Sequence, residues 1–161
     1  MAIDNQALAE LRRLVGAENV LTAREDLIPY SFDGTAALKQ MPGCVVMAKV
    51  ESKKGLNNLA QIAQASDAVM AARGDLYTEI DYPHQIAEVM KRIRQVCGDK
   101  AVAASRMLGS LLRHPMPSCP DVMDVQYLKE MGYTRFLIGD DICFKKEVLM
   151  QAVRIMKAVF A

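Results

Sequence analysis

Two short apolar runs that end abruptly in charged residues constrain the fold of this chain most. The first is Met47–Val50, followed by Glu51, and the second is Met70–Ala72, followed by Arg73-Gly74-Asp75. Runs of this length that are rich in Val, Ala and Met are typical of buried strands in a parallel sheet. Parallel α/β folds carry their chemistry where such strands end. The pattern therefore predicts two adjacent strand ends that carry acidic side chains.

The remaining pattern repeats strand and helix four times. Strands are predicted at residues 44–50, 67–72, 101–105 and 135–139, and helices at about 55–65, 84–97, 121–131 and 146–159. This alternation favours right-handed crossovers and a parallel sheet. Four such units are half of a TIM-type (β/α)₈ barrel, which needs about 250 residues in all. The fold class predicted for this chain of 161 residues is therefore an α/β half-barrel, (βα)₄, with a small helical N-terminal extension.

Two arrangements would protect the edges of such an open sheet. Two copies could close an eight-stranded ring as a homodimer. Alternatively, residues 1–43 could fold over the exposed edge. We favour association of two copies on sequence grounds.

The N-terminal extension has its own local signals. A helix is predicted over residues 4–15, capped by Asp4 or Asn5 and ended by Gly16. A short strand near residues 19–21, a helical turn around 24–27 and a loop through 33–43 are expected to follow. We place the domain boundary between residues 1–46 and residues 47–161.

Charge and cysteine content restrict the partners. The formal net charge is +1 and no basic block stands out, so neither nucleic acid nor an anionic membrane is an expected partner. The four cysteines are widely separated, which predicts buried free thiols in a reducing compartment. We find neither a leader pattern nor an apolar run of membrane-spanning length, and we expect a soluble cytoplasmic protein.

Glu51, Asp75 and Lys49 form the candidate site. Two carboxylates beside one ammonium suit a divalent cation and an anionic, oxygen-rich ligand. The alternative is a simple ion pair between Lys49 and Glu51 at a strand end. Arg73 could likewise only pair with a carboxylate on the rim or across an interface, and Ser105 could cap a helix that follows it.

Residues 47–161 contain an ordered set of motifs that resembles the C-terminal half of the pyruvate kinase barrel. Lys49-Val50-Glu51-Ser52 is similar to the family's K-I-E-N, and Asp67–Leu76 is similar to D-G-I-M-V-A-R-G-D-L. Ala103–Leu108 stands where the family has A-T-Q-M-L, and Leu137–Asp140 where it has L-S-G-E. The usual Thr and Gln are Ser105 and Arg106 here, and the last Glu is Asp140.

The resemblance implies roles for these residues. Glu51 and Asp75 would bind Mg²⁺ or Mn²⁺, and Lys49 would stabilise negative charge on the reacting group. Backbone N–H groups around Gly74 and Asp75 would hold a substrate carboxylate, with Arg73 and Ser105 beside it. Lys49 and Ser105 are the candidate catalytic residues. The matched positions lack the family's early strands and lid, which disfavours ATP-linked phosphoryl transfer.

Residues 1–46 resemble a different family. Leu11–Thr22 and Tyr30–Thr35 are similar to the extreme N-terminus of FAD-linked glycolate/lactate-type oxidases. The similarity stops before their glycine-rich phosphate loop, so we expect no FAD and a structural role.

Three functions stay open. The first is a metal-dependent enzyme that acts on a pyruvate-like 2-oxo acid through an enolate, as a lyase or decarboxylase, working as a homo-oligomer. The second is a non-catalytic or regulatory module that binds a metal and a small anion. The third is a chimeric half-barrel without an evolved activity.

Overall fold

A computed structural model describes residues 4–27 and 45–161 of the chain. The N-terminal elements are α1 (Asn5–Val15), the 3₁₀ turn η1 (Ala17–Asn19), β1 (Val20–Leu21) and α2 (Arg24–Leu27). The predicted first helix is confirmed with its cap, because the Asp4 carboxylate accepts hydrogen bonds from the backbone N–H groups of Gln6 and Ala7. The predicted loop through residues 33–43 lies outside the described residues.

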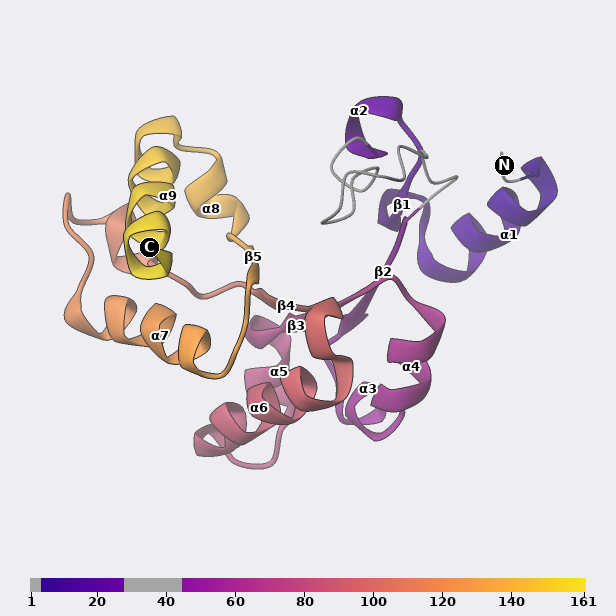
Figure 1. Cartoon of the computed structure of the whole chain (residues 1–161), viewed down its shortest axis with the longest axis horizontal. Coiled ribbons are helices and arrows are strands. Elements are labelled where there is room, and N and C mark those ends of the chain that lie inside the picture. The colour runs from indigo at the N-terminus through magenta and orange to yellow at the C-terminus, as the bar shows by residue number, and fades with distance from the viewer. Residues whose placement is uncertain (1–3, 28–44) are drawn as a thin grey trace.

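A five-stranded sheet in the order β1-β2-β3-β4-β5 forms the centre of the structure (Figure 1). Strands β2 (Val45–Val50), β3 (Ala68–Ala72), β4 (Ala101–Ala104) and β5 (Arg135–Leu137) are parallel. The α/β class and the parallel sheet are therefore confirmed. Sequence order equals spatial order, so consecutive carboxyl ends lie side by side along one edge of the sheet.

Strand β1 is antiparallel and pairs with the outer edge of β2, with Val20 opposite Val46 and Leu21 opposite Val45. The N-terminal extension therefore occupies part of the edge that we expected a second copy to cover. The pairing is short, because β1 has two residues and pairs with only the first third of β2. One edge of the largely parallel sheet is thus covered in part by β1, in the manner of the alternative in which residues 1–43 fold over the exposed edge.

Helices follow each strand, and several bounds differ from the prediction. The elements are α3 (Lys53–Asn57), α4 (Leu59–Ala65), α5 (Arg73–Glu79), η3 (Pro83–Gln85), α6 (Ile86–Cys97), η4 (Gly98–Lys100), η5 (Gly109–Leu112), α7 (Cys119–Glu130), α8 (Asp140–Cys143) and α9 (Lys146–Phe160). The helix predicted over 55–65 is interrupted at Asn58. Helix α7 begins two residues earlier than predicted, because the Ser118 hydroxyl caps it and accepts from the Asp121 N–H. The short helix α5 starts directly after β3, and α8 starts after the two residues that follow β5; the sequence pattern predicts neither helix.

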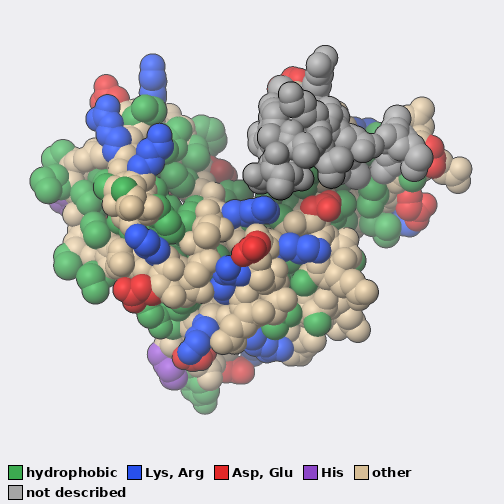
Figure 2. All heavy atoms as spheres, in the orientation of Figure 1, with side chains coloured by type: hydrophobic (Ala, Val, Ile, Leu, Met, Phe, Trp, Pro, Cys, Tyr) green, Lys and Arg blue, Asp and Glu red, His purple; other side chains and the backbone are tan. Residues whose placement is uncertain are grey.

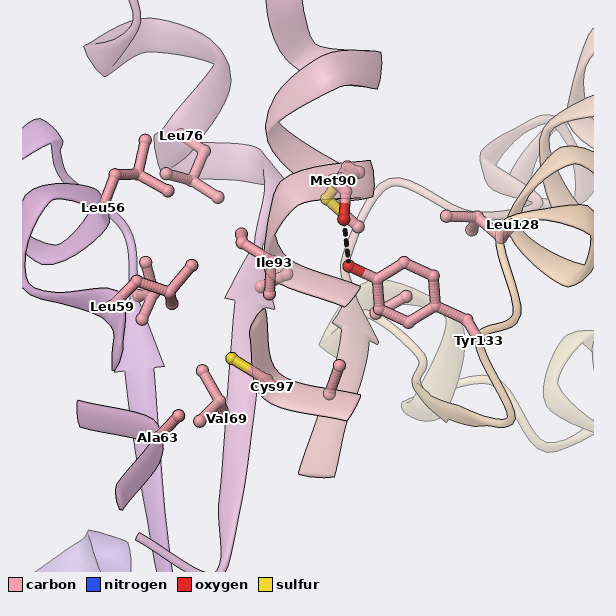
Figure 3. Close-up of a cluster of buried hydrophobic side chains, with 14 of the residues drawn as sticks. Leu56, Leu59, Ala63, Val69, Leu76, Met90, Ile93, Cys97, Leu128 and Tyr133 are labelled. Atoms are coloured by element: carbon pink, nitrogen blue, oxygen red, sulfur yellow. Dashed lines mark hydrogen bonds between the residues drawn. The ribbon is translucent and has the colours of Figure 1, made fainter. Parts of the chain in front are cut away.

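The main core lies between the sheet and helices α3–α6 (Figure 3). Val69 from β3 and Ile93 from α6 are fully buried in it, and Tyr133 enters from the turn before β5. The Tyr133 hydroxyl donates a hydrogen bond to the Met90 carbonyl oxygen at 2.8 Å. A second cluster, centred on Leu108, Val125 and Ile142, fixes α8 and α9 beyond the far end of the sheet. The first cluster thus includes residues of β3 and β4, and the second begins just after β4, at Leu108.

Cys44 lies outside the described residues, and the other three cysteines have free thiols that are not uniformly buried. Cys97 is buried, whereas Cys119 and Cys143 are exposed. The prediction of buried thiols is therefore wrong for these two residues, because Cys119 opens α7 and Cys143 ends the short α8. Within residues 4–27 and 45–161, none of the helices combines the length and apolar character that crossing a membrane requires.

Candidate functional site

The carboxyl ends of β2, β3, β4 and β5 bring the predicted site residues to one edge of the sheet. Val50 pairs with Ala71, so Glu51 leaves β2 beside the point where Arg73 leaves β3. Ala72 pairs with Ala104, which places Ser105 beside the same turn. Figure 2 shows basic and acidic side chains intermixed over the region where Figure 1 draws strands β2–β4. Parallel pairing therefore assembles the site from segments that are far apart in the sequence.

Lys49 bridges the two predicted acidic residues. Its Nζ lies 2.5 Å from Glu51 Oε2 and 3.3 Å from Asp75 Oδ2. The three side chains are 49%, 45% and 59% exposed, so solvent and ligands can reach them. Hydrogen bonding to Glu51, and then to Asp75, raises the pKa of Lys49 above its ordinary value, against an opposing effect of partial burial. Lys49 therefore contacts carboxylates from both strand ends rather than Glu51 alone, and the metal-binding role of Glu51 and Asp75 stays a prediction.

Gly74 and Asp75 lie in the first turn of α5, where backbone N–H groups have no partner one turn earlier in the helix. The sequence predicts that these groups receive a substrate carboxylate. A Cβ at Gly74 would lie 3.8 Å from Arg106 Nε, so the turn is approached closely by the segment after β4.

Arg73 is buried, with 8% of its surface exposed. Its Nη1 donates to both carboxylate oxygens of Asp124 at 2.7 and 2.9 Å. Its Nε and Nη2 donate to the Ser105 carbonyl oxygen, and Nη2 also donates to that of Arg106. The predicted pairing with a carboxylate is confirmed, but the partner lies on α7 rather than on an exposed rim. The substrate-binding role stays a prediction, since these protein acceptors engage all three guanidinium nitrogens.

The turn after β4 is held in an unusual conformation. Ser105, Arg106 and Leu108 have positive φ values of 67°, 54° and 54°. This left-handed region is costly for residues other than glycine and asparagine. Arg73 offsets that cost by donating to two carbonyl oxygens of the turn, and the Ser105 N–H donates to the Leu137 carbonyl oxygen at 3.1 Å.

Ser105 is half-buried at the end of β4, beside the pocket described next. The alternative in which its hydroxyl caps a following helix is wrong, because the next helical turn, Gly109–Leu112, begins after Leu108. The role of Ser105 near a ligand, which the resemblance implies, therefore stays a prediction.

Arg106 is a neighbour of the site to which the sequence assigned no role. Its guanidinium lies 5.1 Å from the centroid of the Tyr77 ring, a cation–π contact. Ser105 and Arg106 also line a pocket of about 420 Å³, together with Asp140 and Asp141. The signal that could have found it is the change from Gln in the family motif to Arg here.

The part of the chain that the structure describes has no cluster of three or more His, Cys, Asp or Glu side chains placed to hold a metal. A divalent cation at the edge of the sheet would therefore have two protein carboxylates, Glu51 and Asp75, and would take its other ligands from water or substrate. Mg²⁺ is commonly bound in this way, through one or two carboxylates.

Comparison with known proteins identifies the fold and the family. Residues 36–128 match the family model "Pyruvate kinase, barrel domain". The chain is 34% identical over 120 residues to the pyruvate kinase of Mycoplasma genitalium, covering 66% of this chain and 23% of that protein. It is 37% identical over 114 residues to the pyruvate kinase of Methylorubrum extorquens, covering 65% and 24%.

Solved structures agree. The crystal structure of pyruvate kinase from Pyrobaculum aerophilum has a TM-score of 0.64 and 27% identity, over 71% of this chain and 28% of that one. A pyruvate kinase from Cryptosporidium parvum has a TM-score of 0.63 over 94% of this chain, and at 21% identity it supports the fold alone. The chain spans about a quarter of the length of these relatives. By its matched domain, the ordered strand-end motifs and the geometry of their side chains, the chain belongs to the pyruvate kinase family.

Proposed function

We propose that the chain binds Mg²⁺ or Mn²⁺ together with a small 2-oxo acid, or a similar small anion, at Lys49, Glu51 and Asp75. The observation that carries the proposal is the ammonium group of Lys49, which contacts carboxylates from two adjacent strand ends. Two acidic groups that converge on one positive charge form a place where a second, multivalent cation would be favoured.

The donor set fits a hard divalent cation. Carboxylate oxygens are preferred ligands of Mg²⁺ and Mn²⁺, and both side chains are exposed enough to reorient. When bound, such a metal supplies Lewis acidity towards a carbonyl oxygen. Lys49 would then turn its ammonium towards the anion, as a second positive charge beside the cation.

The remaining residues would position the anion. Backbone N–H groups of Gly74 and Asp75 are proposed to receive its carboxylate, and the Ser105 hydroxyl lies at the next strand end. Arg73 supports this arrangement by holding the turn that carries Ser105. Lyase or decarboxylase chemistry through an enolate is the catalytic form of the proposal, in which Lys49 and Ser105 act on the reacting group. The non-catalytic form is a binding or regulatory module.

Nucleotide-linked phosphoryl transfer is not part of the proposal, which is confined to the residues at the carboxyl ends of the strands. We further propose that the chain is a half-barrel that closes with a second copy. In the described part of the chain, β5, a strand of only three residues, pairs with β4 alone, and its other side is the edge that a partner would extend. Residues 1–46 are proposed to be structural, and the pairing of β1 with β2 supports this role.

Titration calorimetry with Mn²⁺, with and without pyruvate or oxalate, tests the proposed binding. We expect micromolar to millimolar Mn²⁺ affinity that strengthens with oxalate, and loss of this binding in Glu51→Gln and Asp75→Asn. Glu130→Gln, an equal change at an exposed residue at the end of α7, is the matched control and should bind as the wild type does. Absence of heat in the wild type would end both the catalytic and the non-catalytic form.

A further inference from the structure

Arg106 is the feature near the site that the proposed function does not use. Its backbone is fixed: the carbonyl oxygen accepts from buried Arg73, which is itself held by Asp124. Its φ of 54° is left-handed, so the backbone turns at Arg106 instead of continuing the extended conformation of β4. The side chain therefore starts from a defined point at the end of β4, next to Ser105.

The guanidinium of Arg106 lies against the first turns of α5. It stacks over the Tyr77 ring, and its Nε is 3.8 Å from the position of a Cβ at Gly74. Gly74 directly precedes Asp75, whose carboxylate contacts Lys49. The Arg106 guanidinium thus lies against the turn that carries the proposed anion site, whereas its backbone follows β4, the next strand of the sheet.

No carboxylate among the described residues forms an ion pair with Arg106. Asp75 is engaged by Lys49, and Asp124 by Arg73. Asp140 and Asp141 line the same pocket as Arg106 without forming an ion pair with it, and Asp141 accepts from the backbone N–H of Ile142. An exposed, oriented guanidinium without an anionic partner is suited to bidentate binding of a carboxylate.

We propose that Arg106 binds the second carboxylate of a 2-oxo dicarboxylic acid whose first carboxylate and keto group occupy the Lys49–Glu51–Asp75 site. This inference rests on the proposed function and narrows its ligand class from monoanions such as pyruvate to dianions. Tyr77 contributes by holding the guanidinium over its ring, so that less side-chain freedom is lost on binding.

Pairs of 2-oxo acids of equal chain length test the proposal. 2-Oxoglutarate is compared with 2-oxovalerate, and oxaloacetate with 2-oxobutyrate, by calorimetry at fixed Mn²⁺. The wild type should bind at least one dicarboxylate about tenfold more tightly than its monocarboxylate match, as one charge-assisted contact would give. Arg106→Gln should remove this preference and leave the affinities for the monocarboxylates unchanged, and Arg106→Lys should keep part of it.

Arg113→Gln is the matched control, since Arg113 is an exposed arginine that lines a second pocket together with Arg106, and its loss changes the net charge equally. It should leave the preference intact. Equal binding within each pair by the wild type, equal weakening of both acids by Arg106→Gln, or the same effect from Arg113→Gln would each overturn the role of Arg106. If the wild type binds none of the four acids with Mn²⁺, the proposed function and this inference fail together, whereas binding without preference removes only the inference.

Discussion

Arg73 and Asp124 form a bidentate pair in which Nη1 donates to both carboxylate oxygens, at 2.7 and 2.9 Å. The arginine begins α5 at the end of β3, and the aspartate lies in the middle of α7. The same guanidinium also holds the carbonyl oxygens of Ser105 and Arg106. One buried cation therefore ties together three segments of the chain behind the candidate site.

We predict that Asp124→Asn destabilises the protein by about 2–3 kcal/mol. The substitution leaves the buried guanidinium of Arg73 without its counter-charge. Because one third of the Asp124 side chain is exposed, we expect the loss of stability to lie at or below the lower end of the range for broken buried ion pairs. Urea unfolding measures the change. Asp81→Asn, which breaks an exposed pair with Lys53, should cost less than about 1 kcal/mol. Similar losses for both variants would show that Arg73 does not anchor the turn.

The strand ends could be predicted from the sequence because their signals are local. Apolar runs broken by charge located β2 and β3, and parallel pairing then required Glu51 and Asp75 to meet beside Lys49. The turn after β4 could not be predicted, since no glycine marks the left-handed residues Ser105 and Arg106. Their conformation depends on Arg73.

The same limit applies to Arg73 itself and to the sheet edge. Its burial depends on Asp124, 51 residues away along the chain. The pairing of β1 with β2 also joins segments that no local pattern connects. Contacts of this kind arise from packing, which a periodicity argument does not include.

Gly132→Ala should destabilise the protein by about 1–2 kcal/mol. Gly132 has a φ of +90° at the end of α7, and an added Cβ would lie 3.3 Å from Arg94 Nε, which donates to the Gly132 carbonyl oxygen. Thermal or urea unfolding checks the value. Gly109→Ala is the control, because a Cβ there meets no atom within 4 Å, and it should change stability by less than about 0.5 kcal/mol. Equal effects would contradict the conformational argument.

Stability should fall with rising pH above about 10 in part through Tyr133. Burial raises the pKa of this phenol above its ordinary value of 10.0. The unfolded chain therefore releases the proton first, so the contribution of Tyr133 is complete below pH 10 and is lost as the pH rises further. The slope from this group approaches about 1.4 kcal/mol per pH unit.

Tyr133→Phe should flatten that alkaline slope, while costing about 1 kcal/mol at pH 7 through loss of the hydrogen bond to Met90. Urea unfolding between pH 7 and pH 12 provides the measurement. Tyr82→Phe controls for the loss of a tyrosine at the surface. An unchanged slope in Tyr133→Phe would show that this phenol does not control alkaline unfolding.

Closure of the half-barrel predicts a concentration-dependent dimer. Sedimentation velocity over a hundredfold range of protein concentration should show a monomer–dimer equilibrium or a stable dimer. The physical reason is the outer edge of β5, which among the described residues pairs with β4 alone and so can extend the sheet. A monomer throughout that range would instead favour the N-terminal segment, through β1, as the sole cover of the sheet.

The most direct test of the central claim is a crystal structure of the whole chain grown with Mn²⁺ and oxalate. We predict an anomalous peak bound by carboxylate oxygens of both Glu51 and Asp75, with oxalate completing the coordination and Lys49 turned towards it. A manganese peak that avoids either carboxylate, or an oxalate bound elsewhere on the chain, would contradict the account.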